Sequence, residues 1–216
     1  MNFIKSAFAA ATMAAVMAPA SAAVVVLDFE GVGDYNPVGN YYGGGAGPNY
    51  GVVFSPLTLA LVDADAGGHG NFANEPSPNT IMFFQDANNA ILNLAAGFTT
   101  GFSFYYTSST AADVTVWDDV NGTGNLLGTI SLAAQFNQNC TGDPTGDYCH
   151  WDAIGVAFSG TAKSINFGGT AIQTGYDNIT FGSETPVPGI PEPSTYAILT
   201  FGLAGVGFAA RRRGSV

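Results

Sequence analysis

Apolar and polar positions alternate with a period of two along most of the central part of the chain. In the segment GFTTGFSFYYTSS, for example, Phe102, Phe104 and Tyr106 fall on one side of an extended strand. No stretch of ten or more residues between Val24 and Gly182 shows the 3.6-residue period of an amphipathic helix. The pattern therefore predicts an all-β domain.

About ten short strands are predicted, at intervals near ten residues. They lie in the segments VVVLDFEG, VVFSPLTLALVDAD (one or two strands), TIMFFQ, GFTTGFSFYYTSS, ADVTVWDD, LLGTISL, AIGVAFSG, KSINFGG and YDNITFG. This spacing is typical of an antiparallel β-sandwich. Between VTVW and LLGTI, the pairs Asn121-Gly122 and Gly124-Asn125 permit the positive φ angles of tight turns, which predicts a hairpin.

Both ends of the chain have a different pattern from the centre. Lys5 precedes an Ala-rich apolar stretch and the sequence Ala20-Ser21-Ala22, which is typical of a secretory signal peptide; the stretch is short for the alternative, a membrane helix. Near the other end, an uncharged run of fifteen residues, Tyr196–Ala210, precedes Arg211, Arg212 and Arg213. This run predicts a short transmembrane helix with its arginines in the cytoplasm.

The domain boundaries follow from these patterns. We expect a signal peptide at residues 1–22, a β-sandwich domain at 23–182, a Pro-rich linker at 183–190 and a C-terminal segment at 191–213. The prolines of the linker favour an extended spacer.

The charge balance excludes one class of partner. Between Val24 and Gly189 the chain has fifteen Asp and Glu residues against one lysine, Lys163, for a net charge of −14. A field of this sign repels nucleic acid, so nucleic-acid binding is excluded, whereas divalent cations are attracted.

The two cysteines, Cys140 and Cys149, flank the turn-prone octet TGDPTGDY. In an oxidising compartment this arrangement predicts a disulfide bond. The alternative is a metal site that includes His150, although two cysteines and one histidine make a weak zinc signature.

Three acidic residues lie on strands that a sandwich can place side by side. Asp28 and Glu30 share one face of the first strand, and Asp177 lies in the last. Carboxylates brought together repel one another unless a hard cation such as Ca²⁺ binds them, here with Asn178 as a further ligand. Solvated carboxylates on separate strands are the alternative. The acids in DADAGGHGN, Asp63 to Asn71, lack EF-hand spacing and are explained by turn chemistry.

Exposed aromatic rings are the candidate ligand-binding residues, because their faces match the apolar faces of sugar rings. The candidates are Tyr41, Tyr42, Tyr50 and Trp117, with Trp151 after the disulfide; packing in the core is the alternative for the tryptophans. No catalytic residue is assigned, because the chain has two histidines and lacks both the Gly-x-Ser-x-Gly elbow and a His-Glu-x-x-His helix. A catalytic pair of carboxylates, as in glycosidases, stays open as an alternative, because the fifteen acids offer many combinations.

The C-terminal segment PEPSTYAILTFGLAGVGFAARRR resembles the PEP-CTERM sorting signal of exported bacterial proteins. It has Pro191, Glu192 and Pro193, then the apolar run, then the arginine cluster. This resemblance implies processing by an exosortase, transient residence in the inner membrane, and delivery to the cell surface or extracellular matrix of a Gram-negative bacterium that makes exopolysaccharide. From DFEG to YDNITFG, the body is similar to jelly-roll carbohydrate-binding modules, in which a structural Ca²⁺ is common.

These observations together predict an exported, non-catalytic surface or matrix protein that binds exopolysaccharide. Two alternatives remain open: a structural matrix component without a ligand site, and a secreted glycoside hydrolase.

Overall fold

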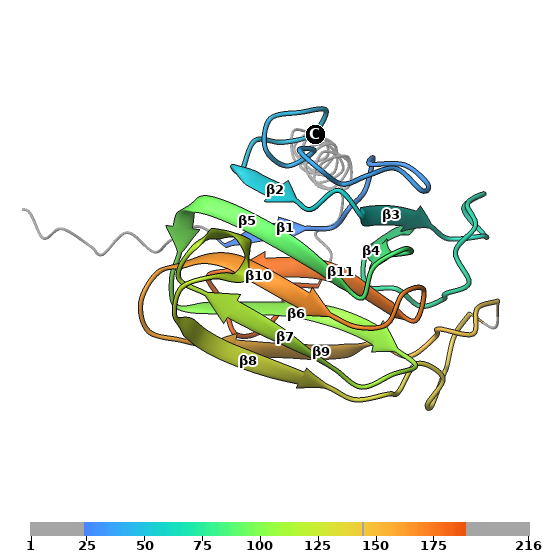
Figure 1. The fold of residues 1–216 in the computed structure, drawn as a ribbon. Coiled ribbons are helices and arrows are strands. Elements are labelled where there is room, and N and C mark those ends of the chain that lie inside the picture. Colours follow the sequence, from blue (N-terminus) through green and yellow to red (C-terminus); the bar gives the residue numbers. More distant parts are fainter. Residues whose placement is uncertain (1–23, 144, 189–216) are drawn as a thin grey trace, which may run out of the picture.

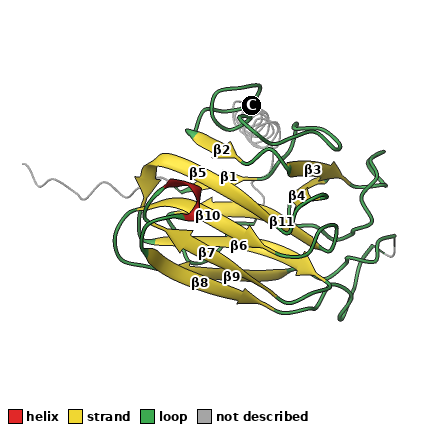
Figure 2. Ribbon diagram, in the orientation of Figure 1, coloured by secondary structure: helices red, strands yellow, loops and turns green. Residues whose placement is uncertain are grey.

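The structure is a computed structural model that describes residues 24–143 and 145–188, and almost all of its regular elements are strands (Figure 2). The strands are β1 (Val25–Leu27), β2 (Val52–Phe54), β3 (Thr58–Val62), β4 (Thr80–Phe84), β5 (Asn89–Phe98), β6 (Gly101–Ser108), β7 (Ala112–Trp117), β8 (Leu126–Leu132), β9 (Asp152–Ala157), β10 (Ala162–Gly168) and β11 (Thr174–Phe181). A single turn of 3₁₀ helix at Val120–Gly122 lies between β7 and β8. Within the described residues, no helix is long and apolar enough to cross a bilayer.

Two antiparallel sheets lie face to face (Figure 1). The first has the order β3-β4-β11-β6-β9, and β1 pairs with β11 beyond the end of β4. The second has the order β2-β5-β10-β7-β8. The expected all-β, antiparallel sandwich is confirmed, as are the β7–β8 hairpin and the pairing of the first strand with the last.

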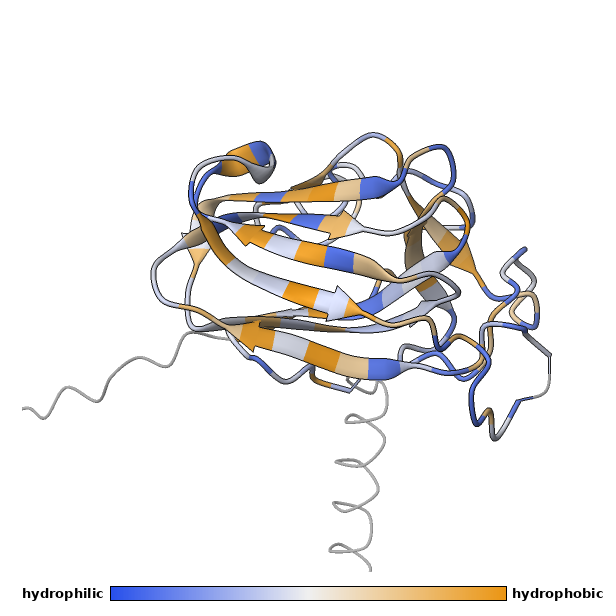
Figure 3. Cartoon of the chain, turned by 60° about the horizontal axis from the view of Figure 1, so that its bottom comes forward, coloured by the Kyte–Doolittle hydropathy of each residue, from blue (hydrophilic) through white to orange (hydrophobic). Residues whose placement is uncertain are grey.

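An aromatic core fills the space between the sheets. Along several strands, residues alternate between this core and the outside, and Figure 3 shows the matching alternation of hydropathy on the strands in view. Phe104 on β6 is fully buried, and its ring centroid lies 5.4 Å from that of Tyr176 and 5.9 Å from that of Phe167. Both contacts are edge-to-face: the one with Tyr176 joins neighbouring strands of the first sheet, and the one with Phe167 crosses to the second sheet and stabilises the sandwich.

The longest strand, β5, was not expected from the sequence. Its segment NAILNLAAGF contains Asn, Ala and Gly residues, which have low strand propensity. The strand forms because Ala90 and Leu92 are buried in the core while β5 pairs with both β2 and β10. Tertiary packing therefore overrides local preference in this segment.

The pairing of β11 with β6 is interrupted between Asp177 and Thr180 by a register shift. Asn178, within the interruption, has a φ of 46°, in the left-handed region. Because of this bulge, Tyr176 and Ile179 both reach the core, whereas Gly175 and Asp177 face the outer side of the first sheet. The bulge thus determines which side chains of β11 are available outside the core.

We expect Phe104→Ala to lower the free energy of unfolding by about 3–5 kcal/mol, because it leaves a cavity between the sheets. Leu126→Ala, at a side chain that is 51% exposed, is the control and should change it by less than about 0.5 kcal/mol. Urea unfolding of both variants measures the difference, and equal losses would contradict this account of the core.

Candidate functional site

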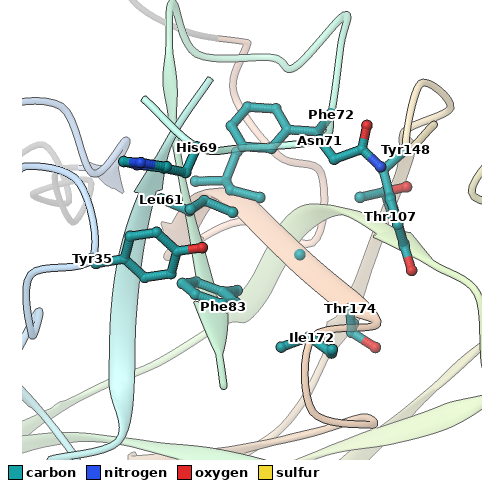
Figure 4. Close-up of a pocket in the computed structure, with 12 residues that line it drawn as sticks. Tyr35, Leu61, His69, Asn71, Phe72, Phe83, Thr107, Tyr148, Ile172 and Thr174 are labelled. Atoms are coloured by element: carbon teal, nitrogen blue, oxygen red, sulfur yellow. The ribbon is translucent and has the colours of Figure 1, made fainter. Parts of the chain in front are cut away.

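A groove of about 240 Å³ opens on the outer face of the first sheet (Figure 4). Its floor is formed by Ile81 and Phe83 of β4, Thr107 of β6 and Gly175 of β11. Its walls come from loops that are far apart in the sequence, and they carry Tyr35, His69, Phe72, Tyr148 and Ile172. The volume is slightly below the roughly 300–1,000 Å³ that is typical of small-molecule sites.

The floor is shaped by strand periodicity and by a glycine. Ile81 and Phe83 face the groove because their neighbours Met82 and Phe84 are buried in the core. At Gly175, a Cβ atom would lie 2.7 Å from Cδ1 of Ile81. A larger residue at this position would therefore push against the floor.

One wall is held by Asp34. Its Oδ1 accepts a hydrogen bond from the amide of Val62 at 3.0 Å, and its Oδ2 lies 2.5 Å from Nδ1 of His69. Burial acts to raise the pKa of Asp34, but the hydrogen bonds from His69 and Val62 outweigh it and lower the pKa below its usual value. Beside this pair, the Tyr35 ring is 45% exposed and packs edge-on against Phe83.

The opposite wall belongs to the loop that the disulfide closes. The Cys140–Cys149 bond is present, with Cα atoms 5.4 Å apart, and Tyr148 immediately precedes it. The Tyr148 hydroxyl donates to Oε1 of Gln173 at 2.9 Å, and its backbone bridges to Phe72 in a short parallel pairing. Figure 4 shows Tyr148 and Thr107 facing Tyr35 and His69 across the groove.

Two features of the groove are costly for the free protein. Ile172 on the rim is 59% exposed and has a φ of 57°, which is a genuine outlier for a β-branched residue. On the floor, Oγ1 of Thr107 is buried and has no hydrogen-bond partner. Outliers and unpaired polar atoms of this kind are concentrated at functional sites.

The prediction that Asp28 and Glu30 share one face of the first strand is wrong, because β1 ends at Leu27 and Phe29 between them has a φ of 61°. N–H and hydroxyl groups bind the carboxylates of the predicted calcium ligands. Oε1 of Glu30 accepts from the amides of Asn79 and Thr80, both at 2.8 Å. Oδ2 of Asp177 accepts from the amide of Ser77 at 2.6 Å. These hydrogen bonds take the role that the sequence analysis assigned to an ion, and calcium shared by Asp28, Glu30 and Asp177 stays a prediction.

Asp177 is nevertheless in an unusual environment. It is completely buried, and this burial raises its pKa well above the usual range, with a smaller contribution from Glu30, while the amides of Ser77 and Asn178 act in the opposite direction. Both amide atoms of the Asn178 side chain are also buried without a partner.

A different set of acids has metal-ligand spacing. Within residues 24–143 and 145–188, the one group of three acids whose ligand oxygens lie within 4.8 Å of one another is Asp63, Asp65 and Asp143, and this cluster could hold a metal ion. This cluster was not predicted from the sequence, where turn chemistry explained Asp63 and Asp65. The alternation of these two acids is a local signal, but only the fold brings Asp143 to them.

The structure brings three of the predicted sugar-binding aromatics together, because the ring centroid of Tyr42 lies 5.0 Å from that of Tyr41 and 6.2 Å from that of Tyr50, but none of the candidates lines the groove. Tyr42 is 2% exposed, and its hydroxyl accepts from the amide of Phe29 at 2.6 Å, so the expectation of an exposed ring is wrong for this residue. Tyr41 is half-buried and donates to the Glu30 carbonyl. Tyr50 is 42% exposed, and Trp117 lies half-buried on the second sheet with its indole N–H bonded to Thr115.

The acidic surface should make stability depend on pH. Burial, with contributions from Asp63, Asp65 and Glu30, raises the pKa of Glu75 from 4.5 to about 7. The folded state then binds more protons than the unfolded state between these values, so stability falls as the pH rises from about 4.5 to about 7.

We expect Glu75→Gln to reduce this loss of stability, measured as urea midpoints at pH 5 and pH 7.5 in EDTA. Glu184→Gln, at an exposed glutamate, is the control and should leave the pH dependence as in the wild type. An unchanged slope in Glu75→Gln would contradict the assignment.

Comparison with known proteins gives two kinds of likeness. No curated protein matches the chain. Among solved structures, it is similar to a family 6 carbohydrate-binding module, with 15% identity, a TM-score of 0.38, and coverage of 74% of this chain and 93% of that one. It is also similar to a carbohydrate-binding module from Cellvibrio mixtus lichenase 5A in complex with cellotriose, with 16% identity, a TM-score of 0.36, and coverage of 59% and 87%. The K1 cleaved adhesin domain of Lys-gingipain from Porphyromonas gingivalis has 14% identity, a TM-score of 0.37, and coverage of 74% and 98%.

The other likeness is in the C-terminal segment. Residues 189–213 match the PEP-CTERM protein-sorting motif, which indicates an exported protein. The predicted motif residues, Pro191 to Pro193 and the three arginines, lie outside the described residues, as do the predicted signal peptide and transmembrane helix. The chain therefore carries a PEP-CTERM sorting motif at residues 189–213.

Proposed function

We propose that this protein is a non-catalytic surface or matrix protein that binds a polysaccharide in the groove on the first sheet. The sorting motif supports passage through the inner membrane, processing by an exosortase, and delivery to the surface or matrix of a Gram-negative bacterium. On this proposal the ligand is the exopolysaccharide that surrounds such cells.

The observation that carries the proposal is the unpaired hydroxyl of Thr107 on the groove floor. A buried hydroxyl without a partner costs about 1–3 kcal/mol, which a ligand hydroxyl can recover by bonding to it when the side chains that cover it move aside. Around it, the rings of Tyr35, Phe72 and Tyr148 and the side chain of Ile172 offer apolar surface. A sugar combines both properties, because its ring has apolar faces and a polar rim.

The lining favours binding over hydrolysis. A glycosidase needs two carboxyl groups about 5–9.5 Å apart on either side of the bond that is cleaved. The residues that line the groove include neither Asp nor Glu. The hydrolase alternative would therefore need a different site from the groove.

Thr107→Val separates binding from stability. It removes the unpaired hydroxyl, so we expect the free energy of unfolding to stay constant or rise by about 1 kcal/mol, while the affinity for polysaccharide falls by about fivefold or more. Thr129→Val, at an exposed position on β8 of the other sheet, is the matched control and should change neither property.

The assay is affinity electrophoresis of the full chain through gels that contain isolated Gram-negative exopolysaccharide, with calorimetric titration of soluble oligosaccharides such as cellotriose. Tyr35→Ala tests the groove wall, and Tyr50→Ala tests the location predicted from sequence. Loss of binding in Tyr50→Ala alone would move the site away from the groove. No retardation of the wild type would favour the structural matrix alternative.

A further inference from the structure

We propose that Asp63, Asp65 and Asp143 bind a calcium ion that joins two segments of the chain. These are the β3–β4 segment, residues 63–79, and the disulfide loop, residues 140–149. This site is separate from the carboxylates of Asp28, Glu30 and Asp177, and it would stand even if the groove bound no sugar.

The geometry is that of a cation site. Each of the three residues offers a carboxylate oxygen, and the three oxygens lie within 4.8 Å of one another. Asp63 is only 5% exposed, and its Oδ1 is buried without a hydrogen-bond partner. An unpaired carboxylate oxygen in a buried position is costly unless a cation or a donor binds it.

The protein supplies too little positive charge and too few donors for these acids. Lys163 is the one Lys or Arg in the described residues, and it lies near Gly97 and Thr161 on the far strand pair β5–β10. Asp143 accepts from the amide of Thr145 at 2.8 Å. The Thr145 hydroxyl lies 3.2 Å from Asp65 and 2.6 Å from Asp143, but its one proton can serve only one of them.

The cluster lies at one end of a hydrogen-bonded seam between the two segments. The amide of Asp143 donates to Oδ1 of Asn74 at 2.9 Å, and Nδ2 of Asn71 donates to Asp147 at 3.0 Å. The amide of Tyr148 donates to the carbonyl of Asn71 at 3.2 Å. A cation bound at the cluster would add a further link between the two segments, next to these hydrogen bonds.

The donor set favours calcium among the common metals. All three ligands are carboxylates, and the two cysteines of the loop are committed to the disulfide, which excludes a thiolate zinc site. Calcium accepts six to eight oxygens in irregular geometry, so the Thr145 hydroxyl and water can complete its shell. With two of the ligands partly or fully exposed, we expect a dissociation constant of about 10⁻⁴–10⁻³ M, as in other extracellular modules.

Asp143→Asn tests the site, because Asp143 is partly exposed and its replacement should not prevent folding. The matched control is Asp86→Asn, an equal change of charge at an exposed residue of the β4–β5 loop. Calcium binding to the full chain, purified in a mild detergent and freed of metal with EDTA, is measured by isothermal titration calorimetry. We expect Asp143→Asn to lose one bound calcium or at least about tenfold in affinity, and Asp86→Asn to bind as the wild type does.

Calcium should reverse the order of stability of the wild type and Asp143→Asn. In EDTA, Asp143→Asn should be at least as stable as the wild type, because it removes repulsion from Asp65. In millimolar calcium, the wild type should be the more stable, and its amide hydrogen exchange should slow at residues 64–74 and 145–149. The proposal is overturned if Asp143→Asn binds calcium as the wild type does, or if calcium leaves exchange in these segments unchanged.

Discussion

The pairing of β11 with strands on both of its sides is the constraint on which the rest of the molecule depends. β6 lies along one side of β11, and β4 and β1 share the other. The bulge at Asn178 then determines which side chains of β11 point into the core and which point to the outer side of the sheet. Tyr176 and Ile179 join the core, Gly175 forms part of the groove floor, and Asp177 lies beneath the amide of Ser77. The core, the groove and the acidic region therefore share a single strand.

The shortage of basic residues determines how the acids are stabilised. With Lys163 as the one lysine or arginine in the described residues, salt bridges to such residues cannot neutralise fifteen carboxylates. Glu30 and Asp177 are bound by the backbone amides of residues 77–80, and Asp34 is paired with His69. In the cluster of Asp63, Asp65 and Asp143, by contrast, Oδ1 of Asp63 is buried without a partner, and Asp65 shares the Thr145 hydroxyl with Asp143. This difference, rather than the mere presence of acids, distinguishes the cluster from the other carboxylates.

Much of the fold could be predicted because its signals are local. Alternation placed Phe102, Phe104 and Tyr106 in the core, Asn121-Gly122 marked the hairpin, and the spacing of Cys140 and Cys149 indicated their bond. β5 was missed because its strand character comes from pairing with β2 and β10 and not from its residues.

The groove was missed for a related reason. Its lining comes from positions as distant as Tyr35 and Gly175, and no short segment contains enough of it to be recognised. The acidic cluster likewise requires Asp143 to meet Asp63 across 80 residues of sequence. Aromatic content could not separate Tyr42, whose ring is buried, from Tyr35, whose ring is open to solvent, because both lie in the same Gly-rich loop.

The position of Tyr148 directly before Cys149 links the shape of the groove to the redox state of its surroundings. One wall belongs to a loop that is closed covalently only after oxidation, whereas the opposite wall is held by Asp34 without any such bond. In a reducing cytoplasm the loop has no covalent closure, and the groove lacks the restraint on its second wall. The second wall of the groove therefore gains its covalent restraint only when the chain has been exported to an oxidising compartment.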